Sequence, residues 1–275
     1  MIRRWAAESL LDYLAESPIK RGKYRLAQLA SLFLDGVPVR SRYGPYLKAR
    51  FADSTFWLAA RYGNDEVIDL LADLGPADGF IDVGANIGLT ACYAAPRCSA
   101  VLALEASSRE FMDLVANCAL LNSSTNPVCL MAAAADSSGF LSFLIGHISH
   151  SGGNSIAPPC DIESNSVSIV PSVSLDELLN ESNLAGWPAM LAPYRAKRIV
   201  VKIDVEGFES LVLKGMKSLL QEQRLRKVIV EVNPERASHL GQGLDIDEMM
   251  ACHGYVPVVS SVGKGHFDQC YLPKA

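Results

Sequence analysis

The sequence predicts an α/β fold in which helices cover both faces of a mostly parallel sheet. Short apolar stretches recur between residues 79 and 258, and segments with helical spacing or capping signals separate them. Buried strands that alternate with helices are typical of βαβ units and parallel pairing. The chain has 275 residues, of which 49% are hydrophobic and 20% charged. This composition is that of a globular protein with a sizeable core.

Charge and hydropathy exclude several classes of protein. The net charge is -5 and the isoelectric point is about 5.6, so the chain lacks the strong basic field that a nucleic-acid backbone requires. Glu8 and Asp12 interrupt the apolar start of the chain, which argues against a secretory signal. No stretch reaches the length of apolar sequence that spans a membrane. We therefore expect neither a nucleic-acid partner nor a membrane span.

The cysteines favour a reducing compartment. They are odd in number and include no C-x-x-C pair, which argues against a metal cluster and against a disulfide framework. We expect small buried side chains and a cytoplasmic protein. The seven are Cys92, Cys98, Cys118, Cys129, Cys160, Cys252 and Cys270.

Residues 1–75 are predicted to form an extension that precedes the main domain. Residues 1–34 have helical spacing, with a break at "SPIKRGK", and residues 36–57 read as short strands with a turn at Gly44 and Pro45. A helix over about 64–74 should end at Gly75. The side chains expected to line the apolar faces of the first two helices are Trp5, Leu10, Leu14, Leu26, Leu29 and Phe33.

Residues 76–275 are predicted to form the main α/β domain. Strands "GFIDVGA", "AVLALEA" and "VCLMAAAA" enclose a helix that stops at Pro96 and a helix over about 108–121 that begins with a capping box of Ser107 and Glu110. The turn "DSSG" leads into "FLSFLI", which reads as a hairpin, and residues 146–172 read as a solvated loop or, less readily, a substrate lid.

The second half continues the same alternation. The strands "IVVKIDVEG" and "KVIVEVN" flank a helix over about 207–223. A helix in "DIDEMMACHG" and terminal strands in "YVPVVSS" and "FDQCYLPK" complete the pattern. In such sheets, ligands bind beyond the carboxyl ends of the strands, where the strand order switches. The first such end is the segment 82–84.

The loop "FIDVGANIG" does not carry a dinucleotide fingerprint. Counted from Gly84, the pattern G-x-G-x-x-G needs glycines where Asn86 and Leu89 stand. Asp82 would repel a phosphate, but it suits a ligand with a positive group such as an amino-acid ammonium. The glycines at 84 and 88 either let the backbone approach the ligand or serve packing alone, and both interpretations remain open at this point.

Glu105 supplies the second clue to the ligand. It ends the second strand, 23 residues after Asp82, where an acid can accept hydrogen bonds from two ribose hydroxyls. A nucleoside that carries an amino acid is S-adenosyl-L-methionine. We therefore expect this cofactor rather than NAD.

Four segments carry a resemblance to a known family. They are "IDVGANIGLTA", "LEASSREFMDLVAN", "AAAADSSGFLSF" and "VKIDVEGFESLVLKGM", and "VIVEVN" adds to them. With these the chain resembles the seven-strand methyltransferases and, more narrowly, the FkbM family. The resemblance covers roughly residues 40–272, and its specific part is the K-I-D-V-E-G run. Residues 1–35 and 146–197 match no pattern, so their role stays open.

The resemblance implies a Rossmann-like, seven-stranded, mostly parallel sheet and O-methylation of a hydroxyl on a small molecule, sugar or lipid-like acceptor. It implies that Glu105 holds the ribose and that the chain near Ala134 lies along the adenine. The residues that it assigns to the methionine part of the cofactor are Asp82, Gly84, Ala85, Asn86 and Gly88.

Lys202 lies in a strand that is expected to be buried, so it needs a counter-charge. We expect a structural pair with Glu231 on the adjacent strand. The alternative is that Lys202 orients catalytic carboxylates.

Asp204 and Glu206 follow the same strand and should face the ligand crevice. A hydroxyl is a poor nucleophile until a base or a cation draws off its proton, so these carboxylates can serve as a base or as metal ligands together with Asn233. We favour a general base without a metal. His147 and His150 are rival bases.

Two other functions compete with methyl transfer. A catalytically silent protein of the same fold would bind the cofactor without turnover, and an NAD-dependent oxidoreductase would need the fingerprint that is missing. The sequence identifies neither the acceptor nor the oligomeric state.

Overall fold

The computed structural model describes residues 2–16, 21–61, 65–144, 155–156, 167–180, 188–233, 246–258 and 267–274. Its centre is a seven-stranded sheet with the order β12-β13-β11-β10-β3-β4-β5. Pairing is parallel from β11 to β5, whereas β13 runs antiparallel to both of its neighbours. The predicted seven-stranded, mostly parallel sheet is confirmed. Its strands are β3 (Asp78–Val83), β4 (Ala100–Glu105), β5 (Val128–Met131), β10 (Arg198–Ile203), β11 (Leu225–Val232), β12 (Tyr255–Val258) and β13 (Phe267–Pro273).

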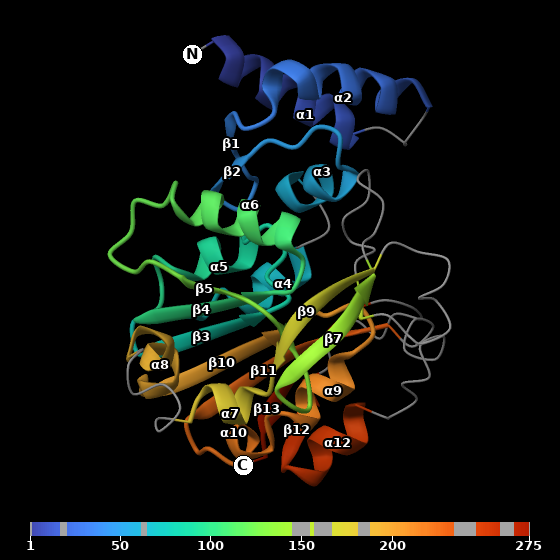
Figure 1. Ribbon diagram of the computed structural model, residues 1–275. Coiled ribbons are helices and arrows are strands. Elements are labelled where there is room, and N and C mark those ends of the chain that lie inside the picture. Colours follow the sequence, from blue (N-terminus) through green and yellow to red (C-terminus); the bar gives the residue numbers. More distant parts are fainter. Residues whose placement is uncertain are drawn as a thin grey trace.

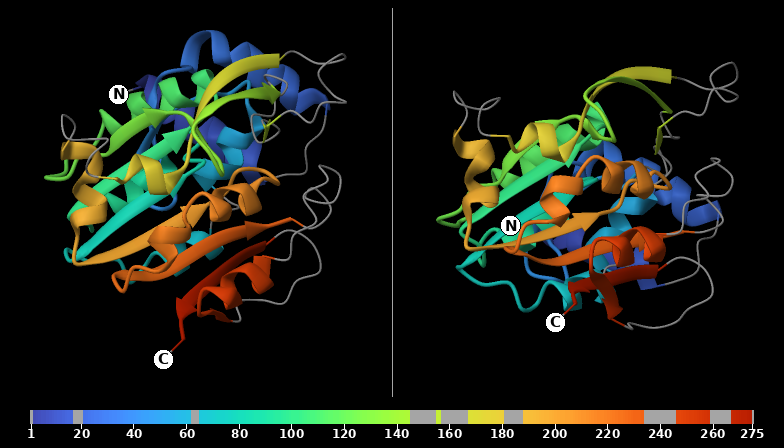
Figure 2. Two further views of the ribbon diagram at one scale, coloured as in Figure 1. Left: turned by 60° about the horizontal axis from the view of Figure 1, so that its bottom comes forward. Right: turned by 90° about the horizontal axis from the view of Figure 1, so that it is seen from below.

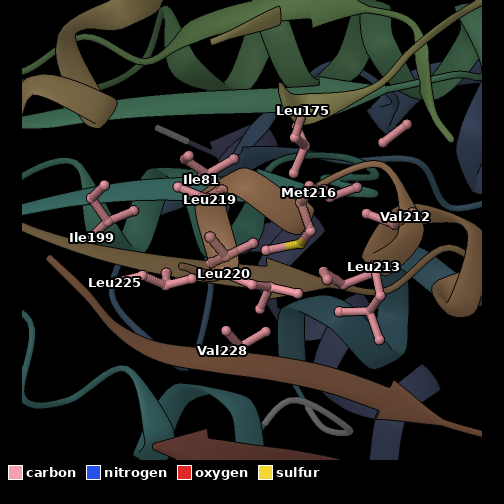
Figure 3. Packing of buried hydrophobic residues seen from close by; sticks show 14 of the residues in the cluster. Ile81, Leu175, Ile199, Val212, Leu213, Met216, Leu219, Leu220, Leu225 and Val228 are labelled. Atoms are coloured by element: carbon pink, nitrogen blue, oxygen red, sulfur yellow. The ribbon is translucent and has the colours of Figure 1, made fainter. Parts of the chain in front are cut away.

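Helices cover both faces of this sheet (Figure 1). The central strands need this cover because their side chains are apolar on both faces of the sheet. Phe80, Val101 and Val200 face α4 (Asp65–Leu70), α5 (Leu89–Ala94) and α6 (Ser108–Cys118). Their neighbours Ile81 and Ile199 face the opposite helices, where Met216 fills the space between strands and helices (Figure 3). The helices of that second face are α7 (Leu175–Leu178), α8 (Pro188–Arg195), α9 (Glu209–Lys214), α10 (Lys217–Leu220) and α12 (Ile246–Cys252).

The predicted helix over 207–223 is two helices, α9 and α10, with a break at Gly215 and Met216. A Cβ on Gly215 would lie 1.9 Å from the carbonyl oxygen of Ala135, so the chain here packs directly against another backbone segment. That contact is tertiary, which explains why helical spacing did not predict the break.

A four-stranded sheet, with the order β6-β9-β7-β8, stands beside the main one (Figure 2). Its strands are β6 (Ala133–Ala134), β7 (Gly139–Leu144), β8 (Ser155–Ile156) and β9 (Val167–Val173). The predicted strand "VCLMAAAA" therefore divides between two sheets. The strand "FLSFLI" is confirmed as β7, but it pairs with β8 and β9 rather than with the strand before it, so a hairpin across "DSSG" is wrong.

The N-terminal extension packs onto the main domain through a cluster of buried side chains that also includes Ile87 and Leu89 of that domain. Helices α1 (Ile2–Glu16) and α2 (Arg21–Leu34) and the hairpin of β1 (Pro38–Arg40) and β2 (Tyr46–Lys48) agree with the prediction. Helix α3 (Ser54–Arg61) was missed, because residues 36–57 read as strands. Leu14 is buried as expected, but Trp5, Leu29 and Phe33 are exposed. Helix α2 packs through Ala27, and Tyr24, Ala30 and Leu34 are partly buried against the same cluster.

Candidate active site

The loop between β3 and α5 is shaped by backbone conformations that favour glycine. Gly84 and Gly88 have φ angles of 76° and 85°, and Asn86 has a φ of 50°. A Cβ on Gly84 would lie 1.7 Å from the carbonyl oxygen of Asp204, and one on Gly88 would lie 2.5 Å from a methyl carbon of Leu114. Both glycines thus make close contacts within the protein.

Glu105 ties this loop to the end of β4. Its Oε2 accepts a hydrogen bond from the Asn86 amide at 2.7 Å, and its Oε1 accepts one from the Ser107 amide at 2.8 Å. Burial raises the pKa of Glu105 to about 7, although both amide hydrogen bonds act in the opposite direction. The carboxyl group is therefore poised to change its charge near neutral pH.

The start of α6 differs in detail from the predicted capping box. Ser107 is the N-cap residue, but its hydroxyl makes no bond to the helix backbone and instead donates to the Glu110 carboxylate. Arg50 and Arg109 also bind that carboxylate. The Ser107 amide, which in a capping box would donate to Glu110, donates instead to Glu105.

Lys202 connects two carboxylates below the loop. Its ammonium lies 3.0 Å from Asp204 Oδ2 and 3.6 Å from Asp82 Oδ1, while Asp82 Oδ2 accepts a hydrogen bond from Thr90 at 2.5 Å. Burial lowers the pKa of Lys202, but the charges of Asp204 and Asp82 outweigh it and raise that pKa overall. Burial raises the pKa of Asp82. The ammonium therefore stays charged.

The prediction that Lys202 pairs with Glu231 is wrong: in the described part of the chain, its ion pairs are with Asp82 and Asp204. The register places Lys202 directly beside Asp82 on β3, whereas on β11 it places Ile229 beside Lys202 and Glu231 two residues further along. Strand β11 is indeed a neighbour of β10, as predicted, but the carboxylate that Lys202 contacts lies on the other neighbour, β3. The alternative reading, a lysine that orients a carboxylate at the strand end, agrees with the Asp204 contact.

The turn after β10 holds the other two carboxylates. Asp204 is about one third exposed, and Glu206 has a φ of 60°, an unusual conformation for a residue other than glycine. Glu209 supports the turn, because its Oε1 accepts hydrogen bonds from the amides of Val205 at 3.1 Å and Gly207 at 3.0 Å. The sequence analysis assigned no role to Glu209. By accepting hydrogen bonds from two amides of the turn, this carboxylate stabilises a strained backbone of the kind found at functional sites.

These segments enclose a cavity of about 430 Å³ at the carboxyl ends of the strands. That size is usual for a small-molecule site. Asp82 and Gly88 do not line the cavity: Asp82 lies beneath it and Gly88 packs on α6. His147 and His150 lie outside the described residues. The predicted site residues that line the cavity are Gly84, Ala85, Asn86, Glu105, Ala134, Lys202, Asp204 and Glu206.

Several lining residues were not predicted. Thr55 and Leu58 come from α3, Phe143 comes from β7, and Glu231 and Asp268 face each other across β11 and β13. A signal for α3 was present: Asp53 precedes it, and its Oδ1 accepts a hydrogen bond from the Thr55 amide at 3.0 Å. No local signal places Phe143 and Asp268 at the cavity, because they reach it through strand pairing. Glu231 was predicted on the strand beside Lys202, but as the partner of that lysine and not as a lining residue.

The cavity shows one sign that it accommodates a ligand. The side-chain oxygen of Asn86, Oδ1, is buried and has no hydrogen-bond partner in the protein. It lies on the same loop whose amide binds Glu105, and both residues line the cavity. A ligand with hydroxyl or ammonium donors fits this pair. Among the described residues, no group of three His, Cys, Asp or Glu side chains is arranged to hold a metal ion.

The sheet order and a cavity at its switch point define the class of seven-strand methyltransferases predicted above. A family model, the methyltransferase FkbM domain, matches residues 82–257. The chain is 31% identical over 225 residues to the hexuronic acid methyltransferase AglP of Haloferax volcanii, a match that covers 82% of this chain and 80% of that protein. The chain therefore belongs to the FkbM methyltransferase family. This membership implies a cofactor of the S-adenosylmethionine type.

The chain is also similar to two solved structures. A methyltransferase FkbM from Methylobacillus flagellatus KT is 13% identical, with a TM-score of 0.45; the match covers 96% of this chain and 58% of that one. TrmK of M. capricolum, solved with S-adenosyl-homocysteine, is 8% identical, with a TM-score of 0.39 and coverage of 75% and 66%. No helix within the described ranges is long and apolar enough to cross a membrane.

Proposed function

We propose that this methyltransferase transfers a methyl group from S-adenosylmethionine to a hydroxyl oxygen of a sugar-like acceptor. The observation that carries the proposal is the position of Asp204. Its carboxylate lines the cavity and is held by Lys202 beside the loop between β3 and α5. Bound in the cavity, S-adenosylmethionine supplies an electrophilic methyl group on a sulfonium. The remaining task is to position a hydroxyl and remove its proton.

The loop residues are proposed to hold the cofactor. Glu105 accepts hydrogen bonds from the ribose hydroxyls, and Asn86 offers its buried side-chain oxygen to a donor of the ligand. Ala134 lies in the wall that would follow the adenine. Asp82 acts from below, through its contacts with Thr90 and Lys202, rather than by touching the ligand.

Asp204 is the proposed general base. Lys202 occupies its Oδ2, which leaves Oδ1 to accept the proton of the acceptor hydroxyl. Removal of that proton by Asp204 would leave on the hydroxyl oxygen the electron pair for the new carbon–oxygen bond. S-adenosylmethionine, when bound, would supply the methyl group, and its sulfur would retain the pair of the broken bond. Lys202 is a positioning residue in this scheme. Glu206, in its strained turn, is the second carboxylate within reach of the acceptor.

The charge of the cavity indicates the kind of acceptor. Among its described lining residues, Lys202 is the only lysine or arginine, and the carboxylates are Glu105, Glu110, Asp204, Glu206, Glu231 and Asp268. Carboxylates accept hydrogen bonds from hydroxyl groups but repel an anion. The relative AglP is named for a hexuronic acid. For this chain we propose a neutral, hydroxyl-rich sugar.

The experiment follows S-adenosylhomocysteine release with matched acceptors, a methyl glucoside and the corresponding glucuronide among them. In a variant with Asp204→Asn, turnover should fall by about 10²–10⁴, the range for a lost general base, while the Kd for S-adenosylhomocysteine stays within a few fold. Full turnover in this variant would mean that the base lies elsewhere, and His147 and His150 would be mutated next.

The same assay separates the competing functions. A silent cofactor-binding protein would bind S-adenosylhomocysteine in a calorimeter but methylate no acceptor. An NAD-dependent oxidoreductase would bind NAD more tightly than S-adenosylhomocysteine. Activity that disappears with EDTA and returns with magnesium would make Asp204 a metal ligand instead of a base.

A further inference from the structure

Helix α2 turns its apolar face outward. Leu26, Leu29, Leu32 and Phe33 are 42%, 63%, 74% and 70% exposed. Spacings of three, four and seven residues place them on one face of the helix. Ala27 lies on the opposite face and is buried. An amphipathic helix of a globular protein normally buries its apolar face, so this arrangement is the reverse of the usual one.

The first turns of α1 add to this surface. Arg3 donates a hydrogen bond to the carbonyl oxygen of Phe33, and Lys23 donates to that of Tyr13 at 2.8 Å, so the two helices run antiparallel. They lie together at the top of Figure 1, beyond β1, β2 and α3. Ile2 and Trp5 are 84% and 71% exposed. The outer apolar face is defined as Ile2, Trp5, Leu26, Leu29, Leu32 and Phe33.

Large apolar side chains gathered on one exposed helix face are typical of an interaction site. The charges beside this face distinguish between two possible partners, a second copy of the chain and an anionic surface. Helix α2 contains no Asp or Glu, and its Lys23 is buried against α1. The basic side chains beside this face are the exposed Arg25 of α2 and the exposed Arg3 of α1, which donates a hydrogen bond to the Phe33 carbonyl oxygen. Two copies paired through α2 would bring these like charges together. An anionic surface would instead be attracted to them.

We propose that the outer apolar face of α1 and α2 binds the interfacial region of a membrane that contains anionic lipids. Leucine and phenylalanine side chains would enter the boundary between headgroups and acyl chains, and Trp5 would lie at the headgroup level. Arg25, which is exposed on the same helix, would face lipid phosphates. The contact is peripheral and involves no spanning helix.

The test is flotation of the full chain with vesicles of phosphatidylcholine alone and with vesicles of equal parts phosphatidylcholine and phosphatidylglycerol. Binding is expected with the second kind and should weaken as salt is added. In a variant with Phe33→Ser, binding should fall by about tenfold or more, the equivalent of one buried aromatic side chain. In a variant with Phe140→Ser, which removes an equally exposed phenylalanine from β7, binding should not change.

Both substitutions are at exposed positions, so thermal melting should show that each variant folds as the wild type does. Failure of the wild type to bind anionic vesicles would overturn the proposal, as would equal loss in both variants. A dimer in sedimentation equilibrium that dissociates with Phe33→Ser would also overturn it, and would make a second copy of the chain the occupant. Methyl transfer to a soluble acceptor is measured separately and does not depend on this outcome.

Discussion

Glu105 shows how the setting of one residue controls a binding site. Its carboxyl group is buried, and its pKa is raised to about 7, so near neutral pH it is present in both charge states. Only the ionised form can accept hydrogen bonds at both oxygens from the loop amides and from the proposed ribose hydroxyls at the same time. The charge state of Glu105 should therefore govern cofactor affinity.

Affinity for S-adenosylhomocysteine should fall as the pH decreases from about 8 to about 6, because Glu105 gains a proton as the pH passes through its raised pKa. Isothermal titration calorimetry across this range measures the effect. A variant with Glu105→Gln should bind more weakly, by about 1–3 kcal/mol, and its affinity should no longer depend on pH in this range. An unchanged pH profile in the variant would assign the titration to another group.

At the scale of elements, the site depends on the close approach of two turns. The loop after β3 and the turn after β10 meet where Gly84 contacts the carbonyl oxygen of Asp204. Neither turn could occupy its place if residue 84 carried a Cβ. This contact holds the proposed cofactor loop and the proposed base in a fixed relation.

Gly84→Ala should therefore cost about 3 kcal/mol or more of unfolding free energy and reduce activity with it. Gly254→Ala is the matched control, because Gly254 has a similar φ, 81° against 76°, but open space where the Cβ would lie. Its cost should be about 1–2 kcal/mol, that of a left-handed conformation alone. Urea denaturation of both variants measures the difference, and equal losses would show that the close contact is not rigid.

At the scale of the whole molecule, the N-terminal extension and the main domain share a core. Leu11 of α1 and Trp57 of α3 belong to the same cluster of buried side chains as Ile87 and Leu89, which come from the loop after β3 and the start of α5. The predicted boundary at residue 75 follows a change in sequence pattern, but this cluster contains residues from both sides of it. We expect the two parts to unfold together.

Leu11→Ala should lower the unfolding free energy by about 2–5 kcal/mol, since Leu11 is fully buried, and thermal unfolding should remain a single transition. Leu29→Ala, on the outer apolar face, should change it by only about 0.5 kcal/mol. Two separate transitions in a calorimetric scan would show that the extension is an independent domain.

The sequence by itself determined which segments form the seven strands of the main sheet, the loop at 84–88, the acid at the end of β4 and the carboxylates after β10. These features depend on local signals: apolar periodicity, glycine at positive φ, and the position of a polar residue at the end of a buried strand. Such signals lie within a few residues of the feature they predict.

Only the tertiary structure decided which groups meet. Lys202 contacts Asp82 rather than Glu231 because strand register, not sequence distance, selects the neighbour. Asp82 does not line the cavity. Thr55 does, because α3 packs over a loop that is distant in sequence. Likewise, the periodicity of α2 predicts an apolar face but not its direction. Helical spacing specifies which side chains share a face, whereas the partners available for packing decide whether that face is buried or exposed.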